Sequence, residues 1–349
     1  MKIFKFLTII LMLFVTLSIS AQKHKKKKKE KRIPKNIELI HSKFSFMPIY
    51  VNEYSYLNIK SRKYDDADEM KYKPNIVGSV GGKLTIKNFT LAYVHALPQA
   101  EDFGKTKATN LIFNLQRRTF GLQFFWIRYS GLYLDTLDRY GIFDDMYKKG
   151  VDNAFIIRPD IKLNNIGFST NFIVNQSFSL NAAFEQTERQ KNSAGSFMFL
   201  MGANYNSIEN DIGESLVLPS QQRYFPRTSD LYSLKSISFK VAPGIGYGFI
   251  IKKYFSIAAT MQAGPNFQFK WFKIDTSNRT HFSPWLSLFY GGKIAFGYNG
   301  KSFMFNLVYS RSKDIIGFRK YFINNIYDCK TNFKYYREFF KISVGFRIL

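Results

Sequence analysis

Apolar and polar residues alternate along most of this chain, and the alternating stretches come in pairs joined by short polar turns. In five such pairs the first stretch ends at the turn and the second begins with phenylalanine or reaches one within a few residues. Successive side chains of a strand point to opposite faces, so each apolar series marks one face of a sheet. The pattern therefore predicts five β-hairpins. Their turns are Lys87-Asn88, Arg117-Arg118, Asn175-Gln176-Ser177, Lys252-Lys253 and Asn299-Gly300.

The other face of these strands is small or polar, and the connections at their far ends are long. A soluble antiparallel sandwich also alternates, but it has no reason to place an aromatic residue beside each short turn. Short periplasmic turns, long outer loops and interfacial aromatics are typical of membrane barrels. We therefore predict an all-β, antiparallel transmembrane β-barrel with short periplasmic turns and long outer loops. The predicted long connections are 53–75, 98–108, 130–160, 265–284 and 312–335.

The number of strands follows from the same pattern, but only to within one hairpin. Thirteen strands are predicted, whereas a barrel with both termini in the periplasm needs an even number. Either 187–236 hides a further strand, which gives fourteen, or 196–205 lies outside the wall, which gives twelve; we favour fourteen. The predicted strands are 43–52, 76–86, 89–97, 109–117, 120–129, 165–174, 178–186, 196–205, 237–249, 255–264, 285–298, 302–311 and 337–349.

The first 22 residues have the pattern of a cleaved secretory signal peptide. Lys2 and Lys5 precede the apolar run Phe6 to Leu17, which is too short to span a bilayer, and Ala21 offers a cleavage site. Residues 23–42 are expected to be a basic disordered segment, and residues 43–349 form the predicted barrel. The expected location is the bacterial outer membrane. The amphipathic last strand is the kind of signal that the barrel-assembly machinery reads, so that machinery and outer-membrane lipids are expected partners.

Composition and charge narrow the picture further. Aromatic residues make up 18% of the chain, including 37 phenylalanines, and the net charge is +26. The run Lys23 to Arg32 carries eight cationic residues against Glu30, so it could bind anionic head groups or act as a solvated tether. The export signal argues against a nucleic-acid partner. Because Cys329 is the only cysteine, packing and backbone pairing have to supply the stability.

Two groups of short motifs resemble an uncharacterised Bacteroidota family known as domain of unknown function 4421. The first group is Phe103-Gly104-Lys105-Thr106-Lys107, Arg117 and Arg128-Tyr129-Ser130-Gly131-Leu132-Tyr133-Leu134. The second is Arg158-Pro159-Asp160-Ile161 and the stretch from Glu188 to Ser196. The resemblance extends from about residue 43 to the end, and it implies a barrel-like outer-membrane protein of a Gram-negative bacterium. The family brings no established activity, so it assigns no catalytic residue.

Charged residues on the predicted lumen face are mostly basic, and rings of Lys or Arg favour anions in pores. Another polar cluster lies beside the predicted strand 178–186, where it would form either a ligand contact and constriction or a structural ion-pair network. The candidate binding residues, in the lumen or in loops, are Lys83, Glu185, Glu188, Arg189, Lys191, Lys240, Lys293 and Arg347. Lys341 also has lumen parity.

No constellation of residues points to catalysis, a metal or a cofactor. His95 has the parity of the lipid-facing residues, so we predict interfacial packing for it. Asp65, Asp66, Asp68 and Glu69 lack the spacing and glycine of a calcium loop, so we predict a solvated outer loop there. The phosphate-loop, zinc and nucleotide fingerprints are not found in the sequence.

Three hypotheses for function follow. The leading one is a non-enzymatic barrel, either a small pore favouring anions or a surface-binding protein. The second is an outer-membrane hydrolase that modifies lipids, which lipid-release assays would test. The third is a structural envelope protein whose basic segment holds other components.

Overall fold

The structure is a computed structural model, described for eleven stretches of the chain. The described residues are 34–40, 44–61, 70–86, 89–98, 104–117, 119–135, 156–210, 214–225, 229–274, 280–318 and 331–348. The predicted signal peptide, the run Lys23 to Arg32 and the carboxylates from Asp65 to Glu69 lie outside them. None of the helices in the described ranges is long and apolar enough to cross a bilayer.

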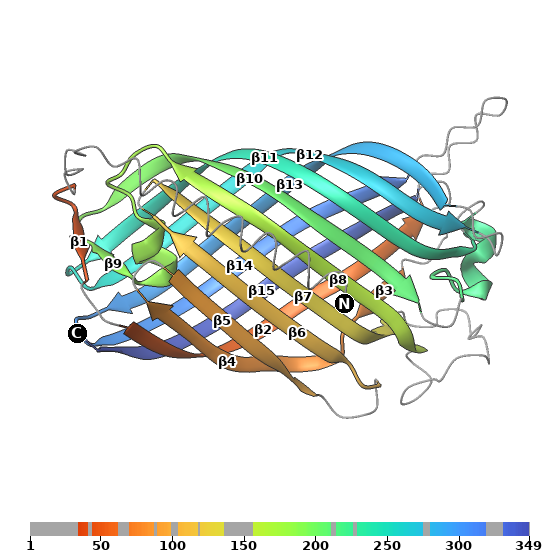
Figure 1. The fold of residues 1–349 in the computed structure, drawn as a ribbon, viewed down its shortest axis with the longest axis horizontal. Helices are drawn as coiled ribbons and strands as arrows, with labels where there is room; N and C mark the ends of the chain where they lie inside the picture. The colour runs from red at the N-terminus through yellow and green to blue at the C-terminus, as the bar shows by residue number, and fades with distance from the viewer. Residues whose placement is uncertain are drawn as a thin grey trace, which may run out of the picture. The chain divides into compact units, whose positions relative to one another are not determined.

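Twelve of the described strands close into an antiparallel barrel (Figure 1). Each strand pairs with the next along the chain, apart from the short strands named below, and the last strand, β15, pairs with β2. The wall strands are β2(Phe44–Ser61), β4(Ile76–Ile86), β5(Phe89–Pro98), β6(Lys107–Gln116), β7(Phe120–Leu134), β8(Ile156–Ile173), β10(Ala194–Asn210), β11(Leu231–Ile251), β12(Phe255–Ile274), β13(Thr280–Asn299), β14(Phe303–Phe318) and β15(Thr331–Ile348).

Three further strands complete the sheet structure. The strand β3(Met70–Lys73) lies between β2 and β7, beyond the end of the β5–β6 hairpin. The strands β1(Ile37–Leu39) and β9(Glu188–Gln190) form a separate two-stranded sheet at the end of the barrel where β15 ends (Figure 1). Strand β1 lies within the 23–42 segment that the sequence predicts to be disordered. These residues form a strand because their backbone pairs with that of β9.

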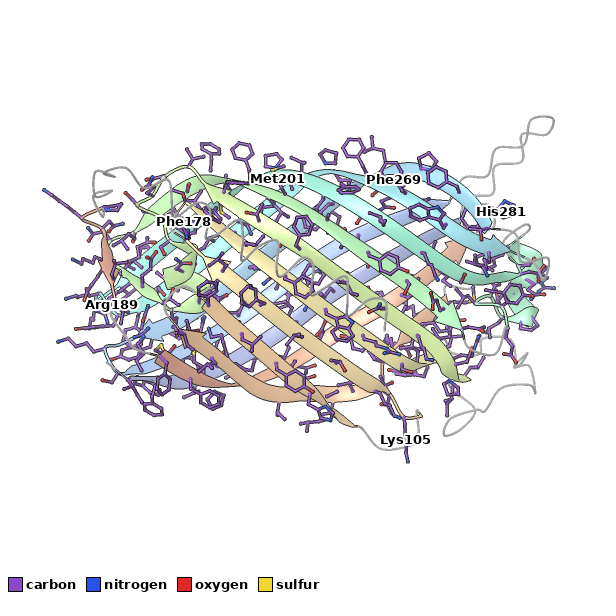
Figure 2. The ribbon with its side chains drawn as sticks, in the orientation of Figure 1. Lys105, Phe178, Arg189, Met201, Phe269 and His281 are labelled. Atoms are coloured by element: carbon purple, nitrogen blue, oxygen red, sulfur yellow. The ribbon has the colours of Figure 1, made fainter. Side chains whose placement is uncertain are left out.

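The wall turns an apolar face outward, as the alternation predicts. Phe197, Met261 and Phe346 are each about two-thirds exposed, whereas Met198, the neighbour of Phe197 along the strand, is buried. Met201 and Phe269 point away from the wall in the same way (Figure 2). Exposed apolar side chains on this scale need a hydrocarbon environment, since soluble monomers rarely expose a continuous apolar patch of more than a few hundred Å².

Aromatic rings gather beside the short turns, which lie at the same end as β1 and β9. Phe255 and Tyr298 have ring centroids 5.0 Å apart, and Phe303 and Phe346 are 5.5 Å apart. These rings lie where an interfacial girdle belongs in a membrane barrel. The arrangement of aromatic residues around short turns was therefore correctly predicted.

The strand count corrects part of the sequence prediction. Residues 178–186, predicted as a strand, instead contain the π-helical turn η3(Asn181–Glu185), and β8 pairs directly with β10. The barrel therefore has twelve strands, not the favoured fourteen, and residues 196–205 belong to the wall as part of β10. The apolar spacing of Phe178 and Phe184 predicted a lipid-facing strand, but both rings are buried inside the barrel.

Several wall strands also extend well beyond their predicted ends. β2, β7, β12 and β14 continue into the predicted loops 53–75, 130–160, 265–284 and 312–335. In β2 and β14 the alternation continues with charged residues on the lumen face, such as Glu53 and Asp314. In β12 the outward apolar series itself continues, through Phe267 and Phe269. The wall is consequently taller than the sequence predicts, and the loops are shorter.

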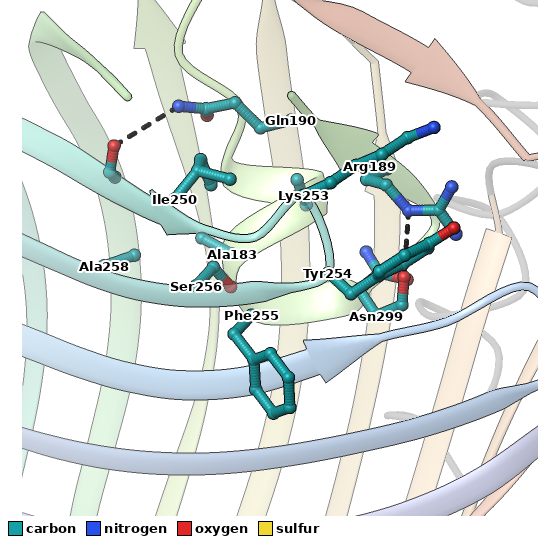
Figure 3. Close-up of a pocket in the computed structure, with 12 residues that line it drawn as sticks. Ala183, Arg189, Gln190, Ile250, Lys253, Tyr254, Phe255, Ser256, Ala258 and Asn299 are labelled. Carbon is teal, nitrogen blue, oxygen red and sulfur yellow. Dashed lines mark hydrogen bonds between the residues drawn. The ribbon is translucent and has the colours of Figure 1, made fainter. Parts of the chain in front are cut away.

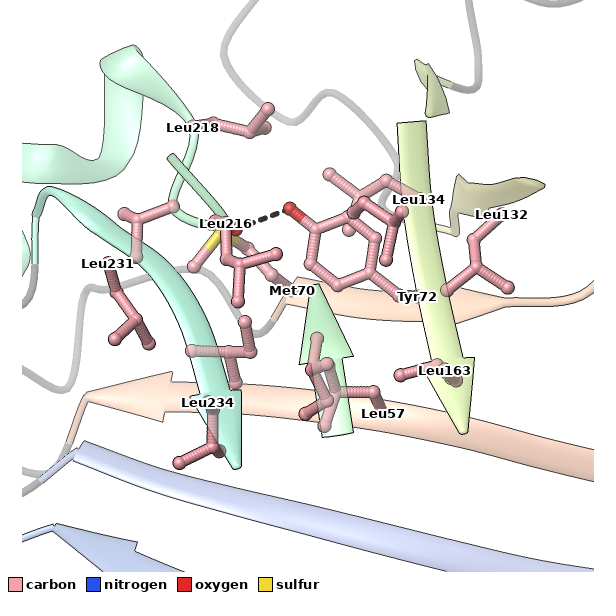
Figure 4. Close-up of a cluster of buried hydrophobic side chains, with 14 of the residues drawn as sticks. Leu57, Met70, Tyr72, Leu132, Leu134, Leu163, Leu216, Leu218, Leu231 and Leu234 are labelled. Carbon is pink, nitrogen blue, oxygen red and sulfur yellow. Dashed lines mark hydrogen bonds between the residues drawn. The ribbon is translucent and has the colours of Figure 1, made fainter. Parts of the chain in front are cut away.

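An apolar cluster fills the lumen at the loop end of the barrel (Figure 4). The segment 214–225, with the 3-10 turn η4(Pro219–Tyr224), contributes Leu216, Val217, Leu218 and Phe225 to it. The Tyr72 hydroxyl from β3 donates to the Leu216 carbonyl over 2.6 Å. We call this cluster the loop-end core.

A buried ion pair fixes the loop-end core to the wall. The Arg158 guanidinium on β8 forms two hydrogen bonds with the Asp160 carboxylate, at 2.9 and 2.7 Å, and also donates to the Ser215 carbonyl. Arg158 is fully buried, so neither charge can be hydrated if its partner is removed. The Arg158-Pro159-Asp160 motif therefore has a structural role.

We predict that Arg158→Ala destabilises the barrel by roughly 3 kcal/mol or more, because it strands a buried carboxylate. Loss of the heat-modifiable folded band with rising temperature, followed by gel electrophoresis of unboiled samples, measures the effect. Arg117→Ala is the control, because Arg117 is exposed beside a short turn and should leave the transition unchanged. Equal transitions for both variants would contradict the structural role of the ion pair.

Candidate functional site

Residues 175–193, which connect β8 to β10, fold inside the barrel at the short-turn end; we call them the plug segment. Phe178 is fully buried against Ile173 and Met198, and Phe184 packs on Ala258, Ala295 and Val308 of the wall. The wall makes room for the segment with glycines. A Cβ at Gly246 would lie 2.7 Å from the Phe178 ring, and one at Gly297 would lie 2.8 Å from the Gln186 amide.

Glu185 of the plug segment faces three lysines of the wall. Its carboxylate lies 3.4 Å from the Lys83 ammonium and accepts a hydrogen bond from the Asn114 amide at 3.4 Å. Lys341 and Lys293 also lie within electrostatic range of it. The arrangement places three cations around one carboxylate in a largely water-excluded space.

These charges set the protonation of Glu185, which lies outside the membrane-spanning strands. Burial alone would raise the pKa of its carboxyl group, but Lys83, and then Lys341 and Lys293, together lower it by more. The pKa therefore lies below the ordinary value, and Glu185 is ionised at neutral pH. One negative charge among three positive ones leaves an excess that favours an additional anion.

The last strand holds the end of the plug segment. The Arg347 guanidinium donates to the Gln186 carbonyl, to the Asn299 side-chain oxygen and to the Gly300 carbonyl. The Gln186 amide in turn donates to the Phe305 carbonyl over 2.7 Å. Arg347 thus joins the plug segment, β13 and β15 at the short-turn end.

Arg189 of the plug segment lies beside Tyr254 and Asn299 of the wall (Figure 3), and Glu188 precedes it in β9. Arg189 donates to the Asn299 carbonyl over 2.9 Å, lies 4.8 Å from the Tyr254 ring centroid and pairs with Glu38 of β1 at 3.0 Å. The buried Glu188 carboxylate accepts a hydrogen bond from the Ser179 hydroxyl. Both side chains are therefore used to hold the segment in place.

Asn36, immediately before β1, ties the two ends of the plug segment together. Its side-chain amide donates to the Ser177 carbonyl at 2.8 Å and to the Asn192 carbonyl at 3.1 Å. Its side-chain oxygen accepts from the Asn192 backbone at 2.7 Å, and its carbonyl accepts from Lys191 at 2.8 Å. We call these contacts the Asn36 clasp.

Two further ion pairs lie deeper in the lumen. Lys240 pairs with Asp314 at 3.1 Å and lies 4.5 Å from the Phe289 ring centroid. Arg337 pairs with Glu53 at 2.9 Å. Glu53, Asp314 and Arg337 lie at or beyond the ends of the strands that the sequence predicts. Extending the alternation of β2 past Val51 assigns Glu53 to the lumen.

The structure brings six of the predicted site residues together in two groups and leaves Lys240 and Lys191 apart from them. Lys83, Glu185 and Lys293 meet around the Glu185 carboxylate, while Glu188, Arg189 and Arg347 hold the plug segment. Lys240 belongs to the deeper ion pair, and the Lys191 side chain is exposed at the mouth. Sequence reasoning missed Asn36 and Asn299, because a polar residue that binds distant backbone has no local signal. His95 faces outward as predicted.

Comparison with known proteins finds a family model and a set of solved structures that resemble this chain. Solved barrels similar to this chain include the toluene transporter TodX of Pseudomonas putida, with 8% identity, TM-score 0.29 and coverage of 88% of this chain and 90% of that one. Others are OmpT of Vibrio cholerae (6%, 0.31, 87% and 99%) and Ail of Yersinia pestis (10%, 0.20, 88% and 100%). At such TM-scores these likenesses carry no argument about what the chain does.

No curated protein matches the chain at a significant level. The family model described as domain of unknown function (DUF4421) matches residues 37–347, nearly all of the described barrel. This agrees with the resemblance that the motifs around Lys105, Arg128 and Arg158 indicate. The chain therefore belongs to the DUF4421 family.

Proposed function

We propose that this protein is an outer-membrane barrel, closed at rest, that admits small anions when its plug segment moves. The observation that carries the proposal is the group of three lysines, Lys83, Lys293 and Lys341, around the single Glu185 carboxylate. Rings of basic residues favour anions in pores. The apolar outer wall supports a membrane location, and the position of β1, β9 and the end of β15 at the short-turn end supports a periplasmic orientation of that end.

The plug segment and the loop-end core explain why the resting barrel would be closed. The first occupies the lumen at the short-turn end, and the second occupies it at the loop end. The two closures differ in kind. The loop-end core is largely apolar, whereas polar contacts supply much of what holds the plug segment, and a polar group that leaves the lumen can exchange its protein partner for water. The plug segment is therefore the part that opens.

A test of gating weakens the plug segment without touching the wall. We predict that Asn36→Ala combined with Arg189→Ala raises the open probability in planar bilayers at least tenfold, because together they remove the side-chain contacts of the Asn36 clasp and the Glu38 pair. Reversal potentials in a salt gradient should show anion preference. Lys191→Ala is the matched control, because its exposed side chain lies in the same segment and should leave conductance at the wild-type level.

Three results would count against the gating proposal. The first is a folded double variant that shows no channel openings, and the second is a double variant that prefers cations. The third is a Lys191→Ala variant that opens as often as the double variant. A silent double variant that keeps its heat-modifiable band would favour the third hypothesis, a structural envelope protein with a permanently filled lumen.

The charge of Glu185 predicts a pH dependence of closure. Its pKa is lowered in the folded state, so its contribution to holding the plug segment is complete above its ordinary value of 4.5 and is lost as pH falls through the lower folded value. We expect the open probability of the wild type to rise when the pH drops below about 4.5. Glu185→Gln should already open more often at pH 7 and should lack this rise; an identical pH profile for both proteins would refute the role of Glu185.

A further inference from the structure

We infer that the outward wall of β6, β7 and β8 carries a binding site for the phosphate of an outer-leaflet lipid head group, formed by Lys107, Arg128 and Lys162. This site lies on the outside of the barrel and does not depend on the plug segment. If the lipid site is disproved, the gating proposal still stands, and if gating is disproved, the lipid site still stands.

Backbone register brings the three cations together on one face. Lys107 and Lys162 are paired with Ser130 from its two sides, and Arg128 is two residues from Ser130 on the same face of β7. At about 4.8 Å between strands and about 7 Å between alternate residues, the three Cα atoms lie within roughly 10 Å of one another. Long flexible side chains at this spacing can converge on a single phosphate.

The cluster lies at the loop-side border of the apolar wall. Along β7, Arg128 follows the outward residues Leu122, Phe124 and Trp126. The Trp126 indole donates to the Asn164 side chain on β8 over 3.0 Å, so an amphipathic ring lies between the apolar band and the cations. Tryptophan at this position marks the membrane interface, where lipid head groups are found.

Two of the three cations, Lys107 and Arg128, are exposed, and Lys162 is half-buried. Near the short turns, the outward residues of the same three strands are apolar, namely Leu115, Leu122 and Phe172. The cations are thus confined to the loop side.

A rigid support fixes the cluster in place. The Asn75 side chain and backbone donate to the Gly104 carbonyl and the Thr106 hydroxyl, at 2.7 and 2.8 Å, and the Thr106 hydroxyl donates to the Gly131 carbonyl at 2.6 Å. Gly131 has a φ of 82°, and a Cβ there would lie 2.4 Å from the Lys105 carbonyl oxygen. Gly104 and Thr106 of the motif Phe103–Lys107 and Gly131 of the motif Arg128–Leu134 therefore anchor the loop end of the β5–β6 hairpin.

The same two motifs supply two of the three cations of the site, and β8 supplies Lys162. Lys107 follows the anchored Gly104 and Thr106, and Arg128 precedes Gly131 by three residues. Lys105 is exposed at the tip of the hairpin and points away from the wall (Figure 2). Phosphate suits this site because a cation–phosphate hydrogen bond is charge-assisted and about twice as strong as a neutral one. The motifs therefore combine an anchor with a cationic face.

The test compares two lipids that differ only in phosphate. Native mass spectrometry in neutral detergent measures how the folded chain binds phosphatidic acid and diacylglycerol with the same acyl chains. We expect phosphatidic acid to be preferred, and the combined Lys107→Gln, Arg128→Gln and Lys162→Gln variant to bind it about 100-fold more weakly, at roughly fivefold per cation. Arg128→Gln alone, expected to cost about fivefold, gives a reading if the triple variant folds poorly.

The matched control is Arg311→Gln on β14. Arg311 also faces outward on the loop side of the wall, but it lies 3.6 Å from the Glu338 carboxylate, so its loss should leave lipid binding unchanged. The inference is overturned if the wild type binds both lipids equally, or if the triple variant binds phosphatidic acid like the wild type. It is also overturned if inorganic phosphate competes as well as the lipid does, because the site would then serve a soluble anion.

Discussion

Closure of the backbone hydrogen-bond ladder between β15 and β2 is the constraint on which the rest of the structure depends. An unpaired amide in hydrocarbon costs several kcal/mol, so a sheet with an apolar outer face has to be rolled shut. Pairing such as Ile342 with Tyr50 joins the two ends of the chain's sheet. Twelve strands then enclose more space than side chains alone can fill, since eight is the number at which they just suffice. Segments 175–193 and 214–225 occupy that space.

The two filling segments divide the lumen by chemistry. The loop-end core is largely apolar, whereas the plug segment binds the wall through charges and backbone contacts that water could replace. Between them lie the lysines around Glu185 and the Lys240–Asp314 pair. Buried charges are costly unless paired, so a surplus of lysines points to use rather than stability.

Alternation was enough to predict the closed barrel, its apolar exterior and the inward direction of Lys83, Lys240 and Lys293, because lipid forces a strict period of two on the outward face. It could not predict the fate of 178–186, since a segment buried inside a barrel is as apolar as one facing lipid. The predicted ends of β2 and β14 were too short because charged Glu53 and Asp314 face the lumen, where polar residues are allowed. The Asn36 clasp joins residues 141 and 156 positions apart, a contact that no local pattern encodes.

The central claim is that the plug segment lies within the lumen. The most direct measurement is the reaction rate of single cysteines with a membrane-impermeant thiol reagent, in the folded barrel and with Cys329 replaced by serine. Ser179→Cys should be protected, because Ser179 is buried, while Lys191→Cys in the same segment should react freely. Equal, rapid reaction of both cysteines would show that the segment lies outside the barrel and would contradict the account.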